Sequence, residues 1–263
     1  MKRHQTGATL IVVMIFLVAI TVIGTIAIRQ SMVALNIATN SQVQQLILQN
    51  SDSAYFNIEL PTNLKKSFSA DGMFGYIEQA KDKNKELIFC YRGDQTEFFD
   101  VTRASLMEWE SGKTKPTNDA LGTDGYCNAK LDATGNWFTS GRKAVMTQVA
   151  VKFSTEMEKD PFYGRQRGQD PKKAQMQEAK RVRIFAVSLM PSLTSVDRAD
   201  INTCLQSHMN EVTIPEDTAK PTIAAGTKDL DNPLKTVTEC LSSLNVPFTT
   251  QVSEYLDIQD STT

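Results

Sequence analysis

The sequence is poor in histidine and carries almost no net charge. Only His4 and His208 occur among its 263 residues, and the formal net charge is -2 with a pI near 5.8. Such a balance gives no overall basic surface, so no specific nucleic acid is predicted as a partner. With 41% hydrophobic residues, the chain is long enough to bury a substantial core.

The common catalytic and metal-binding motifs are missing as well. The sequence has no GxSxG elbow, Walker loop or GxGxxG fingerprint, and no DxDxDG calcium loop. A Ser-His-Asp triad would have to use His208, which no motif surrounds. No His, Cys or carboxylate residues have the spacing of metal ligands. We therefore expect neither an enzyme nor a metal or cofactor, and we expect His208 to be structural or solvated.

The four cysteines contain no CxxC pair, which excludes zinc ribbons and thioredoxin-like motifs. An even set without such a pair favours two disulfides, and therefore an oxidising compartment. Four cysteines allow three pairings, and the sequence alone does not choose among them. The shortest loops, which we favour, join Cys90 to Cys127 and Cys204 to Cys240.

No charged residue occurs between Ala8 and Ile28, directly after the basic start that contains Lys2 and Arg3. About 21 residues at a rise of 1.5 Å match the hydrocarbon thickness of a bilayer. Residues 8–28 are therefore predicted to form a transmembrane helix with a cytoplasmic N-terminus. An ordinary secretory signal is disfavoured, because the apolar run is long and no A-x-A type site follows it.

The helix is expected to continue as an amphipathic stretch over residues 29–57, because no proline precedes Pro61. Its apolar stripe is predicted from Val33, Leu35, Ile37, Val43, Leu46, Ile47 and Leu48. A helix of about 50 residues follows, roughly 75 Å long. One globular domain cannot cover it, so other helices must pack against it, and small residues favour their close approach. These small residues are Ala19, Gly24, Ala27, Ala34 and Ala38.

The basic start ends at Gly7 and is followed by Ala8 and then TLIVV, which resembles the class III signal of type IV pilins and type II secretion pseudopilins. The resemblance implies a leader over residues 1–7, cleavage by a prepilin peptidase after Gly7, and an N-methylated Ala8. It also implies a filament-core helix that begins with Leu10, Ile11 and Val12. Ala8 departs from the usual phenylalanine of the family.

Val12 stands where most members of this family carry glutamate. That glutamate is thought to neutralise the terminal ammonium of a neighbouring subunit, which an apolar side chain cannot do. A subunit without it could sit at the filament tip. The string GATLIVVMIFLVAITVIGTIAIR, which ends at Arg29, is similar to PilX-type minor pilins and to their pseudopilin relative GspK.

The remainder, residues 58–263, is expected to be an exported globular pilin domain. Alternating patterns predict strands near residues 87–91 and 145–153, the latter half-buried. Residues 181–190 are apolar on both faces and are predicted to form a central strand, and apolar residues between 252 and 258 are expected to form a last one. Residues 74–141 are expected to be mainly loops, and residues 199–245 to hold two helices joined by a disulfide. The predicted fold class is α+β: a long N-terminal helix on an antiparallel sheet, with a disulfide-stapled C-terminal region.

Two further features have simpler interpretations. The basic stretch over residues 159–183 could be a nucleic-acid groove, but a solvated hairpin loop is the favoured interpretation. Trp109, Tyr126 and Trp137 could be adhesive aromatics, although core or loop packing is favoured.

Together these features predict a minor pilin that primes assembly of a type IV pilus and sits at its tip. The resemblance implies other minor pilins, the major pilin, the prepilin peptidase and a tip adhesin as partners. It places the chain in the bacterial inner membrane before assembly, with the body periplasmic, and then in the extracellular pilus. Two alternatives stay open: a type II secretion minor pseudopilin, and a membrane-anchored periplasmic binding module with Gly7 there by chance.

Overall fold

The computed structural model describes residues 8–69, 71–76, 83–93, 98–130, 144–153 and 179–258. The chain divides into two compact units, Met1–Gln45 and Leu46–Thr263. The helices are α1 (Ala8–Glu59), α2 (Pro61–Ser67), α3 (Arg198–Ser207) and α4 (Val237–Ser243). The strands are β1 (Lys85–Tyr91), β2 (Ser105–Glu108), β3 (Met146–Phe153), β4 (Ala179–Leu189) and β5 (Phe248–Ile258).

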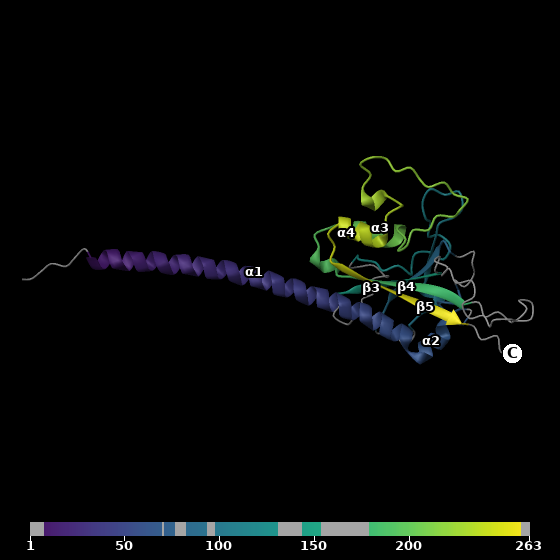
Figure 1. The fold of residues 1–263 in the computed structure, drawn as a ribbon, viewed down its shortest axis with the longest axis horizontal. Coiled ribbons are helices and arrows are strands. Elements are labelled where there is room, and N and C mark those ends of the chain that lie inside the picture. Colours follow the sequence, from purple (N-terminus) through teal and green to yellow (C-terminus); the bar gives the residue numbers. More distant parts are fainter. Residues whose placement is uncertain are drawn as a thin grey trace, which may run out of the picture. The chain divides into compact units, whose positions relative to one another are not determined.

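α1 is a single helix of 52 residues, close to the length that the sequence predicts (Figure 1). It ends at Glu59 because a proline at position 61 disfavours the helical conformation in the residue before it. Leu60 accordingly adopts φ -57 and ψ 128, outside the helical region. Pro61 then opens the short helix α2, where the missing N–H of a proline is harmless.

The second unit holds a five-stranded antiparallel sheet in the order β2-β1-β3-β4-β5. This confirms the α+β class and the antiparallel sheet. The prediction of a half-buried strand over residues 145–153 is wrong, since Gln148 and Lys152 are 1% and 0% exposed. β3 is the middle strand, and both of its faces are covered.

Two buried clusters lie on the opposite faces of the sheet. On one face, Ala54, Tyr55 and Ile58 of α1 pack with alternate residues of the strands, among them Phe89, Val149 and Ile184. On the other face, α3 and α4 form a cap (Figure 1) whose side chains pack with Met146, Val187 and Leu189. The last residues of α1, from Ala54 to Ile58, and the cap therefore cover opposite faces of the sheet.

The stretch predicted as loops contains one further strand. β2 pairs with β1 in the register Leu87 to Leu106 and forms one edge of the sheet. Trp109 and Tyr126 are buried beside it at 0% and 1% exposure, which agrees with core packing. Trp137 lies outside the described residues.

Candidate functional site: the exposed helix and the stapled cap

The first half of α1 exposes apolar side chains all around the helix. Every large apolar residue from Leu10 to Ile37 is between 50% and 67% exposed. The predicted filament-core residues Leu10, Ile11 and Val12 are 65%, 60% and 51% exposed. Exposed apolar surface of this extent marks a region that contacts lipid or other proteins.

By its length and composition, this helix could cross a membrane, a test that an N-terminal signal sequence also passes. The hydroxyl of Thr21 donates to the carbonyl of Val18, and that of Thr25 to the carbonyl of Val22, each at 2.8 Å. Hydroxyls bonded in this way carry little cost in an apolar environment. A Cβ added at Gly24 would meet nothing within 4 Å, so the space beside this residue is open.

The predicted processing residues lie at the start of this helix. Gly7 is outside the described residues, and Ala8 is the first residue of α1. The first turn of α1 contains no acidic residue. Neither Val12 nor the first turn of α1 thus provides a carboxylate near the start of the helix.

The part of α1 that belongs to the second unit begins at Leu46, and its first buried residue is Ile47. The fully buried positions of α1 lie three or four residues apart, at Ile47, Ser51, Ala54 and Ile58. Val33, Leu35 and Ile37, which the sequence places in the same stripe, are instead 58%, 63% and 66% exposed.

Tyr55 of α1 forms hydrogen bonds with the backbone of both β4 and β5. Its hydroxyl lies 2.8 Å from the carbonyl oxygen of Ile184 and 2.9 Å from that of Gln251, and these two acceptors share its one proton. The phenolic group is thus satisfied inside the core, where an unpaired hydroxyl would be costly.

Both disulfides follow the shortest-loop pairing. Cys90 is bonded to Cys127, and Cys204 to Cys240, with sequence separations of 37 and 36 residues. The first joins β1 to the segment after β2, and the second joins α3 to α4. No cysteine is left free.

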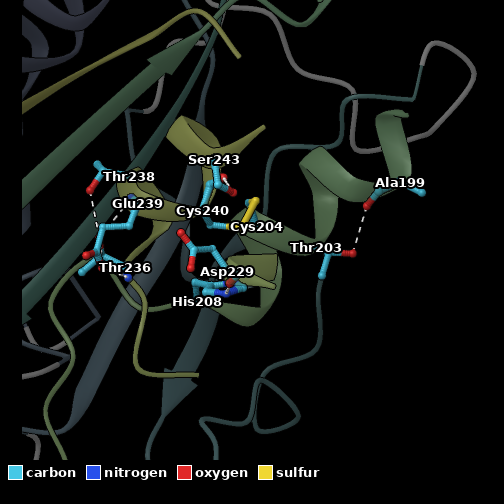
Figure 2. The surroundings of a disulfide bond; sticks show 10 residues. All are labelled: Ala199, Thr203, Cys204, His208, Asp229, Thr236, Thr238, Glu239, Cys240 and Ser243. Carbon is cyan, nitrogen blue, oxygen red and sulfur yellow. Dashed lines mark hydrogen bonds between the residues drawn. A yellow bond between two sulfur atoms is a disulfide. The ribbon is translucent and has the colours of Figure 1, made fainter. Parts of the chain in front are cut away.

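Figure 2 shows how the cap is held around the second disulfide. Thr236 and Glu239 form a reciprocal capping box at the start of α4, and the backbone N–H of Thr236 holds the pKa of the Glu239 carboxyl below its usual value. His208 is 1% exposed, and its Nε2 lies 3.0 Å from the carbonyl oxygen of Asp229. Within the described residues no group of three metal-ligating side chains occurs near it or elsewhere.

A row of charged residues crosses the cap side of the sheet, which sequence reasoning missed. Glu86, Lys152, Arg183 and Glu254 are cross-strand neighbours on β1, β3, β4 and β5. Glu86 and the side chain of Lys152 are 0% exposed. Burial raises the pKa of the Glu86 carboxyl and lowers that of the Lys152 ammonium, each opposed by the partner's charge.

This row holds the segment that follows α3. Glu86 accepts hydrogen bonds from the backbone N–H groups of Asn210 and Glu211, both at 2.9 Å. Lys152 donates to the carbonyl of Glu211 at 2.6 Å and to the hydroxyl of Thr213. The cap is therefore fixed to the sheet by charge as well as by apolar packing.

Two arginines of the basic stretch that the structure describes are paired with carboxylates. Arg181 and Arg183 pair with Glu254 at 3.4 and 3.3 Å, and Arg183 also pairs with Glu211 at 2.7 Å. Residues 159–178 lie outside the described residues. Arg181 and Arg183 thus pair with carboxylates on the sheet and on the segment after α3. The solvated loop over the rest of the stretch stays a prediction.

The geometry therefore combines a long N-terminal helix, a five-stranded antiparallel sheet and two disulfides. No protein-family model, curated protein or solved structure matches the chain. The likeness to pilins rests on Gly7, Ala8 and the apolar run that follows them.

Proposed function

We propose that this chain is a minor pilin of the PilX type, a structural subunit that primes assembly of a type IV pilus and sits at its tip. The observation that carries the proposal is the apolar surface of α1 from Leu10 to Ile37, exposed all around a helix that runs on unbroken to Glu59. Such a helix fits a role in which lipid surrounds it before assembly and other helices surround it afterwards.

The size of this surface makes water an unsuitable environment. Eighteen large apolar side chains lie exposed between Leu10 and Ile37. At about 1.5 kcal/mol for each side chain removed from water, their burial is worth roughly 20–30 kcal/mol. This exceeds the stability of an ordinary domain, so partition into a bilayer or a helical bundle is favoured.

The start of the chain supports processing and a place at the tip. Cleavage after Gly7 would make Ala8 the N-methylated first residue and remove the basic leader. Val12 offers no carboxylate to the terminal ammonium of a neighbouring subunit. A subunit at the tip needs no such pairing, because no subunit follows it.

The globular unit suits an exported position. Two buried disulfides favour the oxidising periplasm, and the basic leader favours a cytoplasmic N-terminus. The partners would be other minor pilins, the major pilin, the prepilin peptidase and a tip adhesin. The mechanism is packing of helices and display of the body, without a chemical step.

The test is deletion of the gene together with detection of the chain in sheared filaments. We expect far fewer pili in the deletion strain, and antibody labelling of the restored chain at one end of each filament. Normal piliation without the chain would contradict the proposal. Loss of protein secretion with normal pili would instead identify a type II secretion pseudopilin.

A further inference from the structure

The two edge strands of the sheet differ in length and in whether another segment pairs with them. β2, at one edge, has four residues, and Glu108 on it forms a two-hydrogen-bond bridge with Thr117. β5, at the other edge, has 11 residues that pair with β4 without a bulge. Long, regular edges are usually shortened, bulged, blocked by proline or covered. β5 is neither short nor bulged and contains no proline, no described segment pairs with its outer side, and its charged residues, Glu254 and Asp257, are both acidic.

The register shows which backbone groups of β5 face outward. The N–H of Met190 donates to the carbonyl of Pro247, so every second pair from there exchanges hydrogen bonds with β4. The N–H and C=O groups of Thr250, Val252 and Glu254 therefore point away from β4. Within the described residues they have no hydrogen-bond partner, and Val252 is 52% exposed.

A stripe on the second half of α1 runs beside this edge. We call it the edge stripe: Leu48, Asp52, Phe56 and Glu59, which share one helical face. Asp52 accepts a hydrogen bond from the side chain of Gln251 at 2.6 Å, and Glu59 accepts one from Tyr255 at 3.1 Å. These two contacts place the stripe along β5.

The edge stripe is both apolar and acidic. Phe56 is 67% exposed and Leu48 is 43% exposed, although both belong to the second unit, which contains the sheet. Asp52 and Glu59 accept only the hydrogen bonds from β5 and form no ion pair among the described residues. A chain segment on the β5 edge would therefore meet two negative charges with an exposed phenyl ring between them.

We propose that the β5 edge receives an extended, basic segment of a neighbouring filament subunit, which adds to the sheet as a sixth strand. Its backbone would pair with Thr250, Val252 and Glu254. Side chains at positions i, i+2 and i+4 would face the helix, with lysine or arginine over Asp52 and Glu59 and an apolar residue over Phe56. The identity of the partner as a filament subunit rests on the function proposed above.

The test measures binding of a fluorescent nine-residue peptide to the full chain in detergent micelles. The peptide carries lysine at positions 3 and 7, valine at position 5 and threonine elsewhere, and a second peptide carries glutamate in place of lysine. We expect saturable binding of the lysine peptide and roughly tenfold weaker binding of the glutamate peptide.

Two variants separate the edge from the charges. Val252→Pro removes an outward N–H without breaking a bond to β4, so it should fold and lower the affinity roughly tenfold or more. Val252→Thr is its matched control and should bind within about twofold of the original chain. Asp52→Asn with Glu59→Gln should lower affinity for the lysine peptide about tenfold and remove the preference over the glutamate peptide.

Several outcomes would overturn the proposal. Absence of binding to the folded chain, equal binding by Val252→Pro, or no preference for lysine would each do so. Self-association of the chain that Val252→Pro abolishes would make a second copy the occupant, and the proposal wrong. If the chain is cleaved after Gly7 but does not bind the lysine peptide, the proposed function stands and only the edge proposal is refuted. If the chain binds the lysine peptide but keeps its leader in cells that contain the prepilin peptidase, β5 still accepts a basic strand. The partner is then not a filament subunit.

Discussion

Replacing Glu86 with alanine should destabilise the globular unit strongly. Glu86 is fully buried and accepts three hydrogen bonds from Asn210 and Glu211, at 2.9, 3.1 and 2.9 Å. Its loss also leaves the buried ammonium of Lys152 without its cross-strand partner. Breaking a buried charge pair costs about 3–5 kcal/mol. For a unit of about 200 residues this lowers the melting temperature by roughly 10 °C.

Unfolding of the full chain in detergent, followed by the fluorescence of buried Trp109, would measure this loss. A Trp137→Phe background makes Trp109 the only reporter. The matched control is the double variant Glu86→Leu with Lys152→Met, which removes both charges and keeps apolar volume. We expect the double variant to lose less unfolding free energy than the sum of the losses of Glu86→Leu and Lys152→Met measured separately. The difference should be at least about 1.5 kcal/mol. A loss below about 1 kcal/mol for Glu86→Ala would refute the reasoning.

The remaining predictions concern the cap. Replacing Cys204 and Cys240 together with alanine should cost about 4 kcal/mol of unfolding free energy, because the bond closes a loop with a separation of 36 residues. Urea unfolding of the oxidised protein would measure it, and a loss under about 1 kcal/mol would be the contrary result. Thr236→Ala should cost about 1 kcal/mol, because it removes the hydroxyl that accepts a hydrogen bond from the N–H of Glu239 in the capping box. Because the folded pKa of Glu239 is depressed, its contribution is present above the usual glutamate pKa and fades as pH falls through the folded value. The difference between Glu239→Gln, which removes the titrating carboxyl, and the original chain should shrink in melts at acidic pH, and a constant difference would contradict this.

The long helix and most of the sheet could be predicted because their signals are local. A charge-free run without proline predicts α1, alternating residues predict β1 and β3, and apolar residues predict β4 and part of β5. The shortest-loop argument also found both disulfides. β2 was missed since its four residues are too few to show a period, and it lies in a stretch rich in turn residues.

The charged row and the open edge could not be predicted, because they depend on contacts between distant segments. Lys152 alternates with apolar residues as an exposed position of a half-buried strand would. It is buried only because the segment after α3 covers that face of the sheet, as the contact with Glu211 shows. The edge stripe likewise exists only once β5 lies beside α1.

The mass of the mature N-terminus tests the central claim most directly. The chain would be extracted from membranes of cells with and without the prepilin peptidase, and its N-terminal peptide measured. The account predicts a chain that starts at N-methylated Ala8 only where the peptidase is present. An intact leader in both strains would contradict it, and residues 8–28 would then be a plain membrane anchor.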